Sequence, residues 1–201
     1  MIGWLYDLVS RGAEKGELGE RRHELVSGLE GEVLEVGAGT GLNLPHYERA
    51  ERVVAVEPDP SMARRLHKRA ADAAVPIEVV TGSVESLPFP DGSFETVVIS
   101  FVLCSVDDPA AGLAEVSRVL VPGGRLVLLE HVRGAGRLAR WQDRLTPLHR
   151  KVAGNCRLNR DTRSAVAAAG FDVSGVEPTR LPGSHPLVRS GIQGVAIRTS
   201  S

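Results

Sequence analysis

The sequence predicts an α/β fold in which a mainly parallel β-sheet carries helices on both faces. Apolar runs of strand length alternate with helix-like segments along most of the 201 residues, an order typical of parallel sheets. The runs at residues 52–57 and 94–101 are almost continuously apolar, as expected of strands that are covered on both faces. A glycine-dense turn at residues 37–41 follows the first apolar run and indicates a tight connection from a strand into a helix.

The predicted elements follow one another in a regular order. Strands are expected at residues 32–36, 52–57, 76–80, 94–101, 125–130, 171–176 and 191–198. Helices are expected at residues 4–9, 18–29, 59–74, 108–120 and 159–169. Asp59 and Asp108, each followed by proline, predict helix starts, because aspartate caps a helix and proline fits its first turn. Asn159 is the predicted cap of the last helix, and a closing hairpin makes the last strand antiparallel.

Composition restricts the class of protein. The hydrophobic fraction of 42% and the net charge of −1 suit a globular chain of one domain and give no reason to expect nucleic-acid binding. No apolar run reaches the roughly 18 residues of a membrane span, and the first residues lack the pattern of a signal peptide. Two cysteines indicate no disulfide framework, so the expected compartment is the cytoplasm. Because Cys104 and Cys156 are distant in sequence and the six histidines show no paired spacing, we expect no metal site.

The turn that ends at Gly41 is the strongest candidate for a ligand site. Glycines at alternate positions let the backbone pass close to a ligand where a Cβ atom would clash. Backbone N–H groups of the expected helix would also face the ligand. A dinucleotide-binding turn requires a third glycine where this chain has Leu42. The alternatives at this point are another nucleotide-like ligand or a tight turn without a ligand.

Four motifs in a fixed order narrow these alternatives. They are Glu35–Gly41, Glu57–Asp59, Leu87–Phe94 and Arg118–Gly124, and together they span roughly residues 30–130. In this order they resemble the motifs of class I S-adenosylmethionine (SAM) methyltransferases. The resemblance implies SAM as the cofactor. It also implies a seven-stranded Rossmann-like sheet of order 3-2-1-4-5-7-6, with strand 7 antiparallel and helices on both faces.

The cofactor residues are expected beyond the carboxyl ends of the strands, where open parallel sheets bind ligands. The resemblance implies that Glu35 faces the ammonium group of SAM. Glu57 is placed to accept hydrogen bonds from both ribose hydroxyls, and the alternative is a solvated acid at a strand end. The expected cofactor-binding residues are Glu35, Gly37, Ala38, Gly39, Thr40, Gly41, Asn43, Glu57, Pro58, Met62, Gly82, Ser83, Val84, Glu85, Ser100, Phe101, Val102 and Ser105.

A narrower resemblance concerns the methyl acceptor. Residues 103–106, 130–132, 141–142 and 154–160 are similar to the mammalian membrane-associated alkyl-thiol methyltransferases, the methyltransferase-like seven group. The resemblance implies SAM-dependent methyl transfer to a small, apolar thiol. An O- or N-methyltransferase of a quinone, phenol or lipid amine is the alternative, and a SAM-binding module without turnover is another. Those relatives carry a long hydrophobic N-terminal anchor, and this chain has only the short segment 2–9 in its place.

A thiol acceptor must lose its proton to attack well, so a nearby base is expected. His131, after the fifth strand, is the first candidate, and the alternative is a hydrogen-bonded structural histidine. Asp107, after the fourth strand, is the second candidate. Cys104 is expected to be a small apolar residue near the methyl donor. The expected substrate residues are Tyr6, Cys104, His131, Trp141 and Leu145. Trp141 and Leu145, four residues apart, either line an apolar acceptor pocket or pack against the sheet.

The single domain divides into four expected parts. Residues 1–30 form a helical segment that either packs on the sheet edge or covers the cofactor as a lid. Residues 31–131 form the SAM-binding core, 132–160 an acceptor-side insert, and 161–201 a closing helix and hairpin. The insert is rich in arginine and has Asp143 as its only acid, so it either attracts an anionic substrate or a peripheral membrane surface, or is a solvated helix face.

Overall fold

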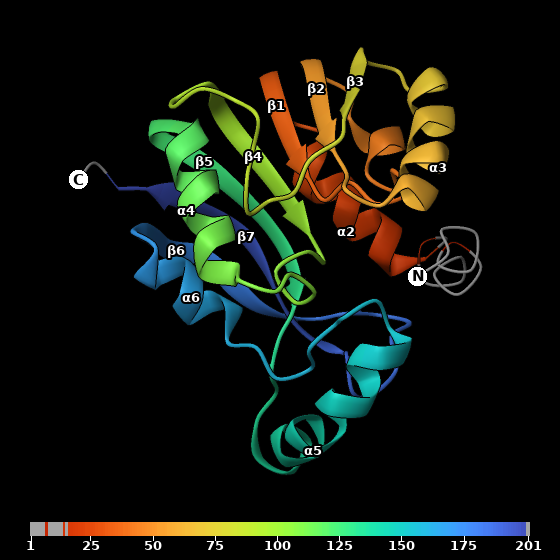
Figure 1. The fold of residues 1–201 in the computed structure, drawn as a ribbon, viewed down its shortest axis with the longest axis vertical. Helices are drawn as coiled ribbons and strands as arrows, with labels where there is room; N and C mark the ends of the chain where they lie inside the picture. Colours follow the sequence, from red (N-terminus) through yellow and green to blue (C-terminus); the bar gives the residue numbers. More distant parts are fainter. Residues whose placement is uncertain (1–6, 8–13, 15, 200–201) are drawn as a thin grey trace.

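A seven-stranded sheet forms the centre of the computed structural model, which describes Asp7, Glu14 and residues 16–199 (Figure 1). The strands are β1 (Gly31–Val36), β2 (Ala50–Val56), β3 (Ile77–Val80), β4 (Phe94–Ser100), β5 (Leu120–His131), β6 (Phe171–Arg180) and β7 (Ser190–Arg198). Their order is β3-β2-β1-β4-β5-β7-β6, and β7 runs antiparallel to both β5 and β6. The predicted fold class, strand order and antiparallel strand are confirmed.

Helices cover both faces of the sheet, α4 and α6 on one and α2 and α3 on the other (Figure 1). The helices are α2 (Glu17–Val26), α3 (Pro60–Ala71), α4 (Pro109–Val119), α5 (Gly136–Val152) and α6 (Thr162–Ala168). Asp59 accepts a hydrogen bond from the Ser61 backbone and Asp108 accepts two from the first turn of α4, so both predicted caps are confirmed.

The predicted cap of the last helix is wrong. Asp161, and not Asn159, caps α6 by accepting a hydrogen bond from the Ser164 N–H. The Arg160 carbonyl accepts a hydrogen bond from the Arg133 backbone and its guanidinium donates to the Leu103 carbonyl. These contacts hold the chain before α6 against neighbouring segments, so the helix begins two residues later than predicted.

The helix expected directly after the glycine turn is also absent from this described segment. Gly37, Gly39 and Gly41 have φ angles of 66°, 60° and 83°, which is the left-handed region that a right-handed helix cannot contain. The Gly41 N–H instead closes a turn onto the Ala38 carbonyl at 2.8 Å. Only a short 3₁₀ helix, η1 (Leu44–His46), follows before β2 begins.

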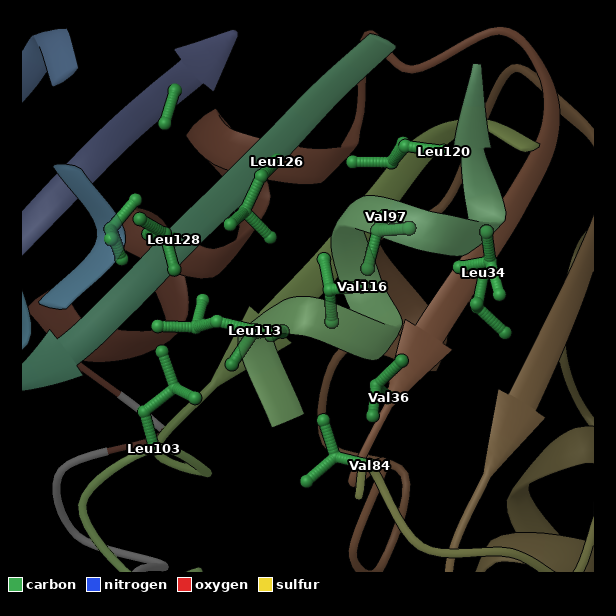
Figure 2. Close-up of a cluster of buried hydrophobic side chains, with 14 of the residues drawn as sticks. Leu34, Val36, Val84, Val97, Leu103, Leu113, Val116, Leu120, Leu126 and Leu128 are labelled. Atoms are coloured by element: carbon green, nitrogen blue, oxygen red, sulfur yellow. The ribbon is translucent and has the colours of Figure 1, made fainter. Parts of the chain in front are cut away.

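Alternation along the central strands builds two apolar cores. Leu34 and Val36 of β1 face α4, where Leu113 and Val116 are fully buried (Figure 2). Val33 faces the opposite side, in the core that includes residues of α2 and α3. Because side chains alternate, Glu35 points to the same side as Val33 and is a carboxylate buried in that face of the sheet.

Candidate functional site

A cleft of about 360 Å³ lies at the carboxyl ends of the parallel strands. The sequence-predicted residues that line it are Glu35, Gly37, Ala38, Gly39, Thr40, Glu57, Pro58, Met62, Ser83, Val84, Glu85, Ser100, Phe101, Val102, Ser105 and Asp107. Further lining residues that were not predicted are Arg22, Leu42, Asp59, Val106, Ala153 and Gly154. Segments from six separate parts of the chain therefore meet around one cavity.

Gly37 makes the close approach on which this cleft depends. A Cβ atom at Gly37 would lie 2.5 Å from a methyl group of Val102, in the loop after β4. The neighbouring Gly39 donates its N–H to Glu57 Oε2 at 2.8 Å. The turn after β1 is thus packed against the β4 loop on one side and tied to the end of β2 on the other.

Glu57 is a buried carboxylate at the end of β2, with 5% of its surface exposed. Its second oxygen, Oε1, accepts a hydrogen bond from the Asp59 N–H at 2.8 Å. Burial raises the pKa of Glu57, although the two backbone donors oppose this shift. Each carboxylate oxygen can accept two hydrogen bonds, so each can still accept one from a hydroxyl group in the cleft.

Glu35 lies in a buried polar network beneath the glycine turn. Its two oxygens accept hydrogen bonds from Asn43 Nδ2 and the Tyr47 hydroxyl, each at 2.9 Å. Arg22 donates to Asn43 Oδ1 at 2.7 Å, and its guanidinium lies 5.3 Å from the centre of the Phe101 ring. Burial raises the pKa of Glu35 to about 7, so the group is poised between its neutral and charged forms near neutral pH.

Arg22 is a residue that the sequence reasoning missed. It lies in α2 among exposed charged neighbours, yet only 4% of its surface is exposed. Glu14 accepts hydrogen bonds from Nε and Nη2 of Arg22 at 2.9 and 3.1 Å. Its spacing of four residues from both Leu18 and Val26 places Arg22 on the buried face of α2, a signal that the sequence carries, but its partners follow only from the tertiary structure.

The N-terminal segment contacts the glycine turn through a described residue. Asp7 accepts a hydrogen bond from Thr40 Oγ1 at 2.6 Å and pairs with Arg65 and Arg69 of α3. The predicted substrate residue Tyr6 lies outside the described residues, as do residues 1–6, 8–13 and 15 of the predicted lid.

The far end of the cleft combines the β4 loop with the segment after α5. Asp107 lines this end, and its carboxylate pairs with Arg157 at 2.9 Å and accepts a hydrogen bond from Asn155 at 3.1 Å. Asn155 has a φ of 65°, a left-handed conformation that directs the chain back towards β4. Gly154 beside it reaches the cleft wall, so part of the predicted insert does contact the cavity.

Seven of the predicted residues that the structure describes do not line the cleft. Gly41, Asn43 and Gly82 lie behind the wall that their neighbours form, and Asn43 acts there through its hydrogen bond to Glu35. Trp141 is 55% exposed on α5, away from the cleft lining, and Leu145 lies on the same helix. The remaining two are Cys104 and His131.

Cys104 and His131 are buried behind the acceptor end, with 2% and 3% of their surfaces exposed. Cys156 lies against both, with its Sγ 3.9 Å from Cys104 Sγ and 3.7 Å from His131 Nε2. Cys104 and Cys156 are therefore distant in sequence but adjacent in the structure. The β4 loop and the segment after α5 bring together residues that are 52 positions apart.

Comparison with known proteins identifies the class. Residues 34–128 match the methyltransferase domain family. The chain is 32% identical over 195 residues to the human thiol S-methyltransferase TMT1A, covering 90% of this chain and 80% of that protein. It is 37% identical over 132 residues to a demethylmenaquinone methyltransferase from Deinococcus radiodurans, covering 62% of this chain and 55% of the relative. A solved SAM-dependent methyltransferase from Thermotoga maritima aligns with a TM-score of 0.68 at 24% identity, over 97% of this chain and 93% of that structure.

Fold, cleft and relatives define a class I SAM-dependent methyltransferase. The chain belongs to this family, and among its members it is similar to the thiol S-methyltransferases. The buried carboxylates Glu35 and Glu57 at adjacent strand ends line the cleft and offer acceptors for hydrogen-bond donors such as ammonium and hydroxyl groups. Among the described residues, no helix is long and apolar enough to cross a membrane.

Proposed function

We propose that the protein transfers a methyl group from SAM to the sulfur of a small, apolar thiol. The observation that supports this most is the extent of the similarity to TMT1A. It covers 90% of the chain and therefore includes most of the segment around residues 133–160, on the acceptor side. The demethylmenaquinone methyltransferase is similar over only 62% of the chain.

In this proposal the chain holds the cofactor by its two buried carboxylates. Glu35 faces the ammonium group, and Glu57 accepts hydrogen bonds from the ribose hydroxyls while it keeps the turn at Gly39 in place. Pro58 and Met62 contact the adenine. SAM supplies a methyl group already activated on a sulfonium, so the protein contributes mainly alignment and the exclusion of water.

The acceptor enters between the β4 loop and the segment after α5. Of the two predicted bases, Asp107 is the one that lines the cleft. We therefore propose that the Asp107 carboxylate accepts the proton of the thiol. His131 lies behind the wall and has no part in this assignment. The backbone around Ser105 and Gly154 confines the acceptor beside the methyl donor.

An assay of S-adenosylhomocysteine release with matched thiols, phenols and amines tests the acceptor class. We expect the highest kcat/KM with an alkyl thiol. Turnover of a quinone, phenol or lipid amine with little thiol activity would favour the alternative acceptors. Tight SAM binding without turnover of any acceptor would favour a binding module.

We also propose that α5 contacts an anionic membrane surface. Trp141, Leu148 and Val152 are 55%, 63% and 72% exposed, and their spacing of seven and four residues places them on one side of the helix. Arg137 and Arg144 follow along the adjoining face at the same helical spacing. An apolar stripe beside a basic stripe suits the boundary between lipid headgroups and acyl chains, where an apolar acceptor would also concentrate.

A further inference from the structure

Three potential metal ligands meet behind the acceptor end of the cleft. Cys104 follows β4, His131 ends β5, and Cys156 belongs to the turn after α5. One ligand atom from each residue lies within 4.8 Å of the other two. The chain has only two cysteines, and the fold brings both into this cluster, which we call the Cys–His–Cys cluster.

The separations inside the cluster resemble those around a tetrahedral metal ion. Zinc–sulfur and zinc–nitrogen bonds imply edges of about 3.8 Å between two sulfurs and about 3.6 Å between a sulfur and a nitrogen. The two sulfurs of Cys104 and Cys156 are 3.9 Å apart. Nδ1 and Nε2 of His131 are 3.8 and 3.7 Å from Cys156 Sγ, so a turn of the ring about its Cβ–Cγ bond presents either nitrogen.

The backbone around the cluster is fixed independently of any ligand. The Arg157 N–H donates to the Cys104 carbonyl at 2.8 Å, which joins the two cysteine-bearing segments directly. Asn155 Nδ2 donates to the Ser105 carbonyl at 2.6 Å. His131 is paired with Gly191 in the sheet. A preformed arrangement of this kind lowers the conformational entropy lost when an ion binds.

A buried carboxylate adjoins the cluster. Glu130 is completely buried, and its Oε1 accepts hydrogen bonds from the Val102 and Leu103 backbones at 2.6 and 2.9 Å. Its Oε2 has no hydrogen-bond partner among the described residues. Unused carboxylate acceptors next to ligands are typical of the outer shell of metal sites, where they accept a hydrogen bond from a ligand or a bound water.

We propose that Cys104, His131 and Cys156 bind one zinc-type divalent metal ion with a fourth position for water or another external ligand. Soft thiolate ligands with an imidazole select this class of ion. Binding releases the two thiol protons, and the resulting thiolates neutralise the charge of the ion. The ion fastens the segment after α5 to the ends of β4 and β5. The inference depends on neither SAM nor the identity of the acceptor.

Titration of the reduced, metal-free full chain with Co²⁺ tests the site without SAM. We expect the absorption bands of thiolate-bound tetrahedral Co²⁺ to saturate at one ion per chain and to disappear when Zn²⁺ is added. Cys156→Ser, at the half-buried position of the cluster, should weaken Co²⁺ binding by more than about tenfold. Cys104→Ala and His131→Ala should have the same effect. His67→Ala, at an exposed histidine of α3, is the control that keeps full binding.

Zn²⁺ should also protect both thiols from a thiol-reactive dye, and circular dichroism reports whether each variant is folded. Equal Co²⁺ binding by the unmodified chain and a folded Cys156→Ser variant would overturn the proposal. A reduced chain that binds no Co²⁺, and that forms only a Cys104–Cys156 disulfide on oxidation, would also overturn it. Neither result alters the methyltransferase assignment, since methyl transfer is assayed separately.

Discussion

Glu35→Gln is the sharpest test of how the protein holds its cofactor. The substitution keeps the size of the side chain but removes its charge beneath the glycine turn. At pH 8 the Glu35 carboxylate, with its pKa of about 7, is mostly ionised and can pair with the ammonium group of SAM. A charge-assisted hydrogen bond contributes about 1.5–3 kcal/mol, so SAM affinity should fall by a factor of about 10 to 150 in the variant.

The raised pKa also predicts a pH dependence. Ionisation of Glu35 falls from about 90% at pH 8 to about 10% at pH 6, while the SAM ammonium stays protonated. If only the charged form pairs with the ligand, SAM affinity of the unmodified protein should decrease about tenfold over this range. The Glu35→Gln variant should show almost no change between the same two values.

SAM affinity should rise with pH, whereas the contribution of Glu35 to the stability of the fold should fall. The folded-state pKa of about 7 lies above the ordinary value of 4.5, so this group stabilises the fold below pH 4.5 and loses that contribution as pH rises through 7. Between pH 4.5 and pH 8, the unfolding free energy of Glu35→Gln should therefore rise by about 3 kcal/mol relative to that of the unmodified protein.

Isothermal titration calorimetry with SAM and S-adenosylhomocysteine at pH 6, 7 and 8 measures the affinities, and urea unfolding measures the stability. Glu32→Gln is the matched control, because it places the same change on an exposed residue of β1. If Glu35→Gln binds SAM as tightly as the unmodified protein at pH 8, Glu35 does not contact the ammonium group.

Further predictions concern the rest of the cleft and its surroundings. Glu57→Ala should weaken SAM binding by about tenfold or more, because it removes two acceptors for ribose hydroxyls; unchanged affinity in calorimetry would refute that role. Gly37→Ala should lower the unfolding free energy by more than Gly92→Ala. Both glycines have φ near +60°, but only at Gly37 would an added Cβ atom meet a neighbouring side chain. Equal losses of unfolding free energy in urea would contradict this packing argument. Asp107→Asn should reduce kcat/KM for a thiol by about a hundredfold with SAM affinity intact, and an unchanged pH–rate profile would mean that the thiolate binds directly from solution. Trp141→Asp should abolish sedimentation with vesicles that contain phosphatidylserine, whereas equal binding of the variant, or equal binding to neutral vesicles, would exclude the proposed contact of α5.

The sequence predicted most of the strands, helix caps and strand-end residues on the cofactor side of the cleft. Short-range signals determine it: apolar runs give the strands, Asp59 and Asp108 cap helices in the residues beside them, and strand ends of a parallel sheet meet at one edge. This is why Glu57 and the residues from Gly37 to Thr40 were correctly expected to lie together. The glycine turn was recognised, but its left-handed backbone excluded the expected helix.

Tertiary contacts decided the surroundings of Glu35 and the orientation of α5. Arg22 becomes part of the Glu35 network because α2 packs over β1; its spacing from Leu18 and Val26 predicts a buried position but not what it contacts there. Trp141 has the spacing of a buried residue, yet the helix that carries it turns this face to solvent. Amphipathic periodicity reveals a face but not what covers it.

Sequence alone therefore predicted the strands from their apolar runs, and its ordered motifs, through their resemblance to a known family, predicted the class of the protein and the order of the sheet. Only the tertiary structure decided that Cys104 and Cys156 meet beside His131. A hydrogen bond between the Arg157 N–H and the Cys104 carbonyl joins the two segments, whose cysteines are 52 positions apart. Contacts at such separation follow from how the elements pack together, and no local pattern of residues encodes them.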